Sequence, residues 1–274
     1  MMTQRFENEV ILKQSLKRRG FNLLSYNPIE NLIFYPQIDE ILQTQFYQFL
    51  KRYSFRIFLK DLIKKKEGFC CEDLTRYCSA KTIERYLKFL LKNEVISSKG
   101  EGYFQLNNPR VKSFGDTFEW FIAQVFQREF YLPASWGIRL KETKNGGDYD
   151  IMTILEGSFV YVETKSSPPK HIERQEILAF LRRINDLKPQ MAIFIEDTRL
   201  RMKDKIVVMF EEGLEKMYGK ESKELFPIQN LIRELYHIHD HLYIINSRPT
   251  LVGNISFCIS HYLKGKGFFS YRPS

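Results

Sequence analysis

The sequence predicts an α/β fold built on a mixed sheet, and three observations lead to that prediction. Residues 148–155 and 158–165 are mostly apolar and flank Glu156-Gly157, as the two arms of a β-hairpin do. The segment 191–195, MAIFI, is a short continuous apolar run, typical of a strand buried on both faces. Segments with helical periodicity precede, separate and follow these strands. Such alternation favours a sheet covered by helices.

The composition indicates a folded protein with a negatively charged partner. The chain has 274 residues, which suits one large or two modest domains. Hydrophobic residues make up 43% of it and aromatic residues 15%, enough for packed cores. The formal net charge of +9 and the pI near 9.2 favour a polyanion such as nucleic acid. A lysine-rich surface that only faces solvent would give the same totals.

Three classes of protein are disfavoured. The longest apolar runs are too short to span a membrane, and the start MMTQRFENEV resembles neither a secretory signal nor a transit peptide. The cysteines form no CxxC pair, which argues against a disulfide framework or a four-cysteine zinc site; they are Cys70, Cys71, Cys78 and Cys258. We therefore expect a cytoplasmic protein with reduced thiols and no membrane partner.

The first half of the chain is predicted to be mainly helical. Residues 1–50 form an N-terminal helical segment without a catalytic signature, interrupted near 25–37 and followed by an amphipathic helix at 38–53. Residues 51–108 form a small second domain. Its predicted elements are a helix at 54–68, a shorter helix at 71–78, a helix at 79–95 and a strand–turn–strand at 96–106. Three helices followed by a hairpin resemble a winged helix-turn-helix domain.

The third of these helices has one apolar and one basic face. Ile83, Tyr86, Leu87 and Leu90 recur at helical spacing on the apolar face. The basic face consists of Lys81, Arg85, Lys88 and Lys92. In a winged helix this face would enter a DNA major groove. A solvated helix on a protein-contact domain is the alternative, because basic stripes of this kind are common.

Residues 109–274 are predicted to hold the α/β sheet, joined to the preceding domain through 107–112. The predicted helices are 113–130, 171–188 and 201–217, and the predicted strands outside the hairpin are 135–143, 191–195 and 242–247, with a helix or strand at 255–263. The resulting order is helix, three strands, helix, strand, helix. That order implies a mixed sheet covered by helices.

Charged residues gather at the open end of the hairpin. Asp148 and Asp150 begin the first arm, and Glu163 and Lys165 end the second. If Glu156-Gly157 is a two-residue turn, counting outward pairs Asp150 with Glu163. Directly opposed residues share a face, with Cβ atoms about 5 Å apart. The sequence therefore predicts two carboxylates side by side with a lysine close by.

Two neighbouring carboxylates repel each other, and a hydrated divalent cation removes the conflict. Mg²⁺ held by Asp150 and Glu163 could polarise a phosphate, and Lys165 could offset developing negative charge. Charged strand ends are also usual in structures, and Glu-x-Lys recurs at 142–144 and 221–223. Neither of those copies ends an apolar strand preceded by an aspartate at hairpin distance.

Asp150, twelve further residues and then ETK at the end of an apolar strand resemble the PD-(D/E)xK nuclease superfamily, over roughly residues 113–215. This group includes restriction endonucleases, Holliday junction resolvases and Mrr-like enzymes. The resemblance implies a restriction-endonuclease-like core of order αβββαβ, with Asp150 and Glu163 as metal ligands and Lys165 as the catalytic lysine. The helix GDTFEWF adds Glu119 to the metal site. Asp148 remains an alternative or auxiliary ligand. Tyr149 stands where the family name has proline.

The resemblance implies a Mg²⁺-dependent endodeoxyribonuclease, a hydrolase of phosphodiester bonds, with DNA as its partner and Mn²⁺ able to replace Mg²⁺. Restriction or defence and recombination or repair both fit, and a homodimer would suit double-strand cutting. The phosphate chemistry is shared by DNA and RNA. The rival interpretation is a catalytically inactive DNA-binding regulator or scaffold on the same fold.

A histidine-rich stretch, HIHDH, is a weaker metal candidate. Its histidines, His237, His239 and His241, alternate and would share a face on a strand, where they could bind zinc. No cysteine or acidic cluster accompanies them at familiar spacing. A polar approach to a strand is the commoner interpretation of such a pattern.

Overall fold

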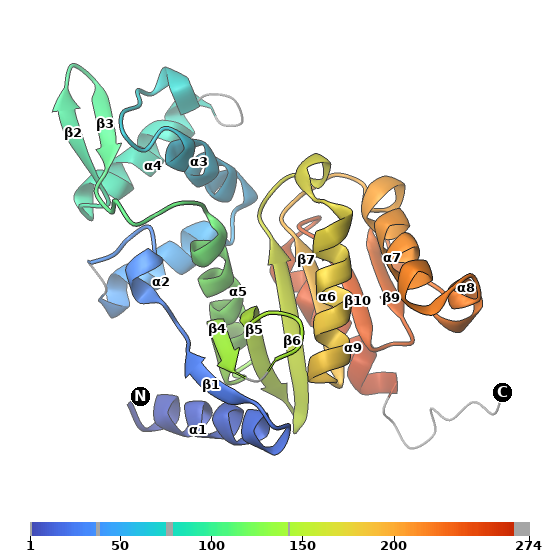
Figure 1. The fold of residues 1–274 in the computed structure, drawn as a ribbon. Coiled ribbons are helices and arrows are strands. Elements are labelled where there is room, and N and C mark those ends of the chain that lie inside the picture. The colour runs from blue at the N-terminus through green and yellow to red at the C-terminus, as the bar shows by residue number, and fades with distance from the viewer. Residues whose placement is uncertain (1, 37–38, 75–78, 142, 266–274) are drawn as a thin grey trace. The chain divides into compact units, whose positions relative to one another are not determined.

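The computed structural model describes residues 2–36, 39–74, 79–141 and 143–265. It confirms the α/β class, since the described chain forms an eight-stranded mixed sheet with helices packed on it (Figure 1). The chain divides into two compact units. We call Asn27–Phe121 the helical unit, and Met1–Tyr26 together with Ile122–Ser274 the sheet unit. Among the described residues, no helix combines the length and apolar character needed to cross a bilayer.

These units differ from the predicted boundaries at residues 50 and 108, because the N-terminal segment is shared between them. Its first helix, α1 (Met2–Arg18), contributes Leu12 and Leu16 to the core of the sheet unit. The short strand β1 (Asn22–Ser25) pairs antiparallel with β4 and forms one edge of the large sheet. Its four residues are mostly exposed, so the sequence carries no alternation that would predict a strand.

The helical unit contains the helices predicted at 54–68 and 79–95 and the predicted hairpin, whereas the described part of the segment predicted as a helix at 71–78 forms a 3₁₀ turn. Its elements are the 3₁₀ turns Ile29–Asn31 and Glu72–Leu74, the helices α2 (Glu40–Leu50), α3 (Tyr53–Lys64) and α4 (Ala80–Lys92), and the strands β2 (Ile96–Gly100) and β3 (Tyr103–Leu106). Phe46 and Phe49 of α2 pack their rings against Phe55 of α3 and Phe89 of α4. These contacts place α2 in this unit rather than in a separate N-terminal segment. Residues 75–78, including Cys78, lie outside the described residues.

In α4 the two predicted faces are observed. Ile83, Tyr86, Leu87 and Leu90 are buried. The basic side chains Lys81, Arg85, Lys88 and Lys92 are all exposed. Lys88 forms an ion pair with Glu84 at 2.7 Å, which reduces the free positive charge of this face.

The sheet unit follows the predicted order helix, three strands, helix, strand, helix. Its elements are α5 (Gly115–Glu129), which begins in the helical unit, β4 (Ala134–Lys141), β5 (Asp148–Leu155), β6 (Ser158–Lys165), α6 (Arg174–Leu187), β7 (Met191–Glu196), a π turn at Lys203–Val207, α7 (Val208–Tyr218), α8 (Ser222–Leu225), β8 (Gln229–Ile232), β9 (Leu235–Ile238), β10 (Leu242–Asn246) and α9 (Leu251–Gly265). The strand order is β1-β4-β5-β6-β7-β10-β9-β8. Only the pairs β6–β7 and β7–β10 are parallel among the described strands.

The predicted hairpin register is confirmed. Leu155 pairs with Ser158, and the ladder continues outward to Ile151 opposite Val162. Glu156 and Gly157 both have positive φ, 46° and 78°, as a two-residue type I′ turn requires. This turn matches the twist of the flanking strands, so the register follows from the local sequence.

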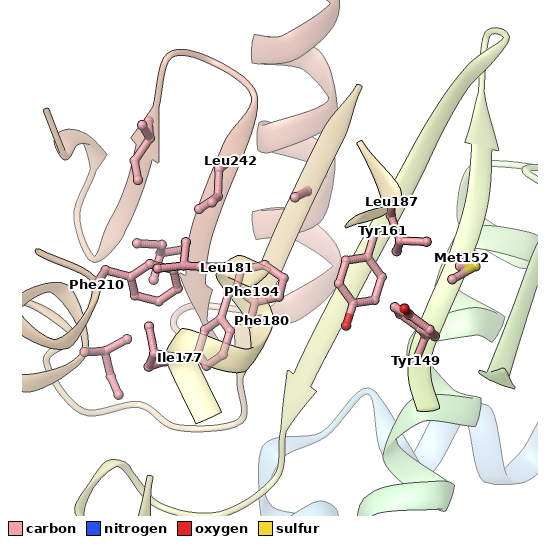
Figure 2. Close-up of a cluster of buried hydrophobic side chains, with 14 of the residues drawn as sticks. Tyr149, Met152, Tyr161, Ile177, Phe180, Leu181, Leu187, Phe194, Phe210 and Leu242 are labelled. Atoms are coloured by element: carbon pink, nitrogen blue, oxygen red, sulfur yellow. The ribbon is translucent and has the colours of Figure 1, made fainter. Parts of the chain in front are cut away.

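An aromatic row forms the core beside the hairpin (Figure 2). Tyr149 contacts Tyr161, which contacts Phe180 of α6. Phe180 in turn meets Phe194 of β7 and Phe210 of α7. The row fixes α6 over β6 and β7. It therefore also fixes which polar residues of α6 lie near the open end of the hairpin.

Candidate active site

The main-chain pairing of β5 and β6 ends at the charged residues. Beyond Ile151 opposite Val162, the Thr164 amide donates to Asp150 Oδ2 at 2.7 Å, and the Thr164 hydroxyl donates to the same oxygen at 3.0 Å. Strand β6 goes on pairing with β7 as far as Lys165 opposite Glu196. The Asp150 carboxylate thus bridges two strands at the point where their ladder ends.

Glu163 is the centre of a buried polar cluster and is 1% exposed. The Tyr161 hydroxyl donates to its Oε2. Arg183 Nη1 donates to both carboxylate oxygens, at 3.2 Å and 2.9 Å. Lys165 Nζ lies 3.0 Å from Oε1. Both oxygens of Glu163 are therefore engaged by cations and a phenol.

Lys165 connects this cluster to helix α6. Its Nζ also lies 3.1 Å from Oε1 of Glu176, and its side chain is 19% exposed. Glu176 belongs to the capping box that begins α6, in which the Glu173 amide donates to Glu176 Oε2 at 2.9 Å. The start of α6 is therefore held both by its own capping box and by the ammonium group of Lys165.

The charges shift the pKa values of the site in opposite directions. Burial, followed by the nearby charge of Glu163, raises the pKa of Asp150 from 3.8 to about 7, against the effects of Lys165 and the two Thr164 hydrogen bonds. For Lys165, burial lowers the pKa, but Glu163, Asp150 and Glu176 outweigh it and raise the pKa above its usual value. Lys165 therefore stays protonated at neutral pH, and Asp150 is the carboxyl group that titrates near neutrality.

Asp148, the other candidate aspartate, lies in different surroundings. It pairs with Arg139 across β4 and β5, and its Oδ1 accepts from Arg139 Nε at 2.9 Å. Its side chain is 76% exposed. The structure thus couples Asp150, rather than Asp148, to Glu163 and Lys165.

Glu119 lies on the part of α5 that belongs to the helical unit. The positions of the two units relative to one another are not determined, so the assignment of Glu119 to the metal site stays a prediction. Lys81, Arg85, Lys88 and Lys92 also belong to the helical unit. Their contact with nucleic acid likewise stays a prediction.

Three residues of the cluster were not predicted as site residues. Tyr161 shares the face of β6 with Glu163 and Lys165, so strand alternation carried a signal for it. Glu176 and Arg183 come from α6 and lie seven residues, about two helical turns, apart. The contacts of Glu176 with Lys165 and of Arg183 with Glu163 depend on how α6 packs on the sheet, which no local pattern encodes. Arg183 also lies over the Tyr149 ring, 5.6 Å from its centroid.

The donor set fits a divalent cation at Asp150 more readily than at Glu163. Among the described residues, Thr164 supplies both hydrogen bonds to Asp150, and both go to Oδ2, which leaves Oδ1 for a ligand role. The raised pKa of Asp150 beside Glu163 is the conflict that a cation would relieve. A cation that binds Glu163 has to compete with Lys165 and Arg183.

No known protein family and no curated protein matches the sequence. Among solved structures, protein VC1899 from Vibrio cholerae is similar with a TM-score of 0.44 and 14% identity, over 73% of this chain and 55% of that one. Can2 from Sulfobacillus thermosulfidooxidans, in complex with cyclic tetra-adenylate, is similar with a TM-score of 0.39 and 15% identity, over 67% of this chain and 50% of that one. The chain thus spans about half the length of each. Similarity at these TM-scores carries no argument about function.

Proposed function

We propose that this protein is a metal-dependent nuclease that hydrolyses phosphodiester bonds in DNA. The observation that carries the proposal is that Asp150 accepts hydrogen bonds from Thr164 where the β5–β6 ladder ends, while the two neighbours of Thr164, Glu163 and Lys165, form an ion pair. Hydrolysis of a phosphodiester needs carboxylates that can hold a metal ion and a cation that offsets developing negative charge. Asp150 and Glu163 are the carboxyl groups at this end of the hairpin, and Lys165 is the cation.

The element order supports a restriction-endonuclease-like core of the PD-(D/E)xK type. The chain runs α5, β4, β5, β6, α6, β7, in the order αβββαβ. The two strands that carry Asp150 and Glu163 are the second and third of this core, joined by the tight turn at Glu156-Gly157. Within the proposal, Tyr149 replaces the family's proline as a buried wall of the site.

In the proposed mechanism Asp150 and Glu163 would hold Mg²⁺, with Mn²⁺ able to replace it, and Glu119 stays a predicted further ligand. A cation held there would supply polarisation of the phosphate and a lower pKa for the attacking water. Lys165 orients the attacking water and offsets the negative charge that develops on the phosphate oxygens. The water oxygen would form a new bond to phosphorus in line as the bond between phosphorus and the leaving oxygen breaks. One proton of the water would pass to solvent, and the leaving oxygen would take up a proton from solvent.

The buried ion pairs set a condition on this mechanism. Lys165 and Arg183 both form ion pairs with Glu163. In the proposal, at least one of these contacts gives way when a cation binds Glu163. Lys165 retains Glu176 as its second partner, so its ammonium group stays paired at the site after Glu163 is released.

We infer that the helical unit positions the DNA. Helix, 3₁₀ turn, helix and hairpin follow one another as in a winged helix, and α4 presents Lys81, Arg85, Lys88 and Lys92 to solvent. Binding through such a face releases counterions from DNA, so its affinity falls steeply with salt. A homodimer would bring two cleavage sites to a duplex. Restriction or defence and recombination or repair are the processes that need such an enzyme.

A second candidate function is a catalytically inactive DNA-binding regulator or scaffold. The observation that favours it is the saturation of Glu163, whose two oxygens contact Tyr161, Arg183 and Lys165. Such a cluster also occurs as a structural ion-pair network that stabilises one arrangement of the core.

One experiment separates the two candidates. The chain is incubated with supercoiled plasmid and with branched DNA in the presence of Mg²⁺, Mn²⁺ or EDTA. The nuclease proposal predicts nicked or linear products with either metal ion and none with EDTA. DNA binding that weakens steeply with salt but yields no product under any of these conditions favours the inactive regulator.

A further inference from the structure

A second group of side chains of the kinds that bind metal ions lies in the sheet unit, between the β9–β10 hairpin and α9. His237 comes from the end of β9, Asp240 from the hairpin turn and His261 from α9. The two imidazole rings are tilted toward each other with centroids 5.1 Å apart. Three potential ligands therefore converge from three parts of the chain.

The turn brings the carboxylate between the two rings. His239 and Asp240 both have positive φ, 52° and 59°, and the His241 amide closes the turn by donating to the Ile238 carbonyl at 3.1 Å. As a result, Asp240 Oδ1 lies 2.8 Å from His237 Nδ1 and 3.9 Å from His261 Nδ1. The Asp240 carboxylate therefore contacts the His237 ring, although half of its side chain is exposed.

The spacing of these atoms suits one small ion. The ligand atoms of the three residues all lie within 4.8 Å of one another. Zinc bonds of about 2.0–2.1 Å in a tetrahedron place neighbouring ligand atoms about 3.3 Å apart. The two measured separations, 2.8 Å and 3.9 Å, lie on either side of that value.

We propose that His237, Asp240 and His261 form a site for a divalent transition-metal ion, and that this ion is Zn²⁺. Transition-metal ions bind imidazole nitrogen well, whereas Mg²⁺ and Ca²⁺ favour oxygen donors. Two imidazoles beside one carboxylate therefore suit a transition-metal ion. Three protein ligands leave a fourth position for water.

The surroundings give the ion both access and support. The Asp240 side chain is 50% exposed, so an ion and its water can enter from solvent, while His237 is 8% exposed and anchors the site. The Tyr243 hydroxyl is hydrogen-bonded to His261 Nδ1 at 3.0 Å and donates to the Asp240 carbonyl at 2.9 Å. Tyr243 thereby fixes the turn that carries Asp240, and its hydrogen bond to His261 Nδ1 gives way when that nitrogen binds the ion.

The other two histidines of HIHDH are directed elsewhere. His239 Nε2 is hydrogen-bonded to the Leu225 carbonyl, and His241 Nδ1 to the Gln190 carbonyl. The three-histidine site that alternation implied is therefore not assembled, because the strand ends at Ile238 and the chain turns. These two histidines serve as matched controls, since they lie beside the proposed ligands without belonging to them.

The site shares no residue with the proposed nuclease site, and the test measures metal binding itself. The full chain is stripped of metal, titrated with Zn²⁺ by calorimetry, and loaded with Co²⁺ for visible spectroscopy. We expect one Zn²⁺ per chain, tetrahedral Co²⁺ absorption bands, and a higher melting temperature with Zn²⁺ because only the folded state has the site.

Two ligand variants and three control variants make the test specific. Asp240→Asn and His261→Gln should each weaken Zn²⁺ binding by about 100-fold or more, since loss of mere supporting residues already costs 10–100-fold. Asparagine tolerates the left-handed turn, and circular dichroism checks that both variants fold. His239→Gln, His241→Gln and Asp150→Asn should bind Zn²⁺ as the wild type does. Absence of Zn²⁺ and Co²⁺ binding in the wild type overturns the proposal, and so does unchanged binding in folded Asp240→Asn and His261→Gln.

Discussion

Replacement of Asp150 by asparagine is expected to lower the rate of DNA cleavage by about 10³-fold while the chain stays folded. The asparagine oxygen can still accept the Thr164 amide and hydroxyl hydrogen bonds that now go to Asp150 Oδ2. The substitution removes only the negative charge that the proposed cation needs. The rate is measured on supercoiled plasmid under single-turnover conditions, and the fold is checked by thermal unfolding.

The pH dependence supplies a second readout for the same variant. The pKa of Asp150 is raised from 3.8 to about 7, so the wild-type rate should increase with pH up to about 7 as the carboxyl group loses its proton and can hold a cation. In the same range the folded state binds more protons than the unfolded state, so this group makes the protein less stable as pH rises from about 4 to 7. Both trends should be absent in Asp150→Asn.

Asp148→Asn is the matched control, two residues away on the same strand. Its ion pair with Arg139 is exposed on both sides, so little stability and little activity should depend on it. The assignment is reversed if Asp148→Asn loses cleavage and Asp150→Asn retains it. In that case Asp148 is the ligand that the sequence left as the alternative.

Replacement of Glu163 by glutamine is expected to reduce the free energy of unfolding by about 3 kcal/mol. Glutamine has nearly the same volume, but it leaves the guanidinium of Arg183 without a counter-charge in a buried place. The Arg183 and Lys165 side chains are only 18% and 19% exposed, so water cannot compensate fully. Lys165 keeps Glu176, which holds the loss at the lower end of what a broken buried pair costs.

A double-mutant cycle isolates this effect. Arg183→Met keeps an apolar stem beside the Tyr149 ring, and in combination with Glu163→Gln it removes both charges. The double variant should recover much of the stability lost in Glu163→Gln, because a buried pair can be replaced by neutral groups at little cost. Urea unfolding measures all four proteins. Equal stability of Glu163→Gln and the wild type would falsify the claim that the ion pairs of Glu163 stabilise the folded protein.

The hairpin shows what local sequence can predict. Apolar strands on either side of Glu156-Gly157, with a turn that requires positive φ, were enough to predict the register from Leu155 opposite Ser158 to Ile151 opposite Val162. Alternation alone put Asp148 and Asp150 on the same face, so only the tertiary structure distinguishes an exposed aspartate from the coupled one. The helices and strands that have clear hydrophobic periodicity were also predicted from local sequence alone.

Elements that depend on tertiary packing were not predictable in this way. Strand β1 has four mostly exposed residues and is defined by its pairing with β4. Arg183 reaches Glu163 because an aromatic row fixes α6 on the sheet. The shared histidine face that HIHDH would have on a strand is not formed, because β9 ends at Ile238 and His239 and Asp240 adopt positive φ without glycine or asparagine to signal it.

A crystal structure of the chain soaked in Mn²⁺, with the ion located by anomalous scattering, tests the central claim most directly. The account predicts one ion that contacts both Asp150 and Glu163, with Lys165 or Arg183 displaced from Glu163, and no ion there in Asp150→Asn. An undisturbed Glu163 still paired with Lys165 and Arg183, and no ion at Asp150, would contradict it.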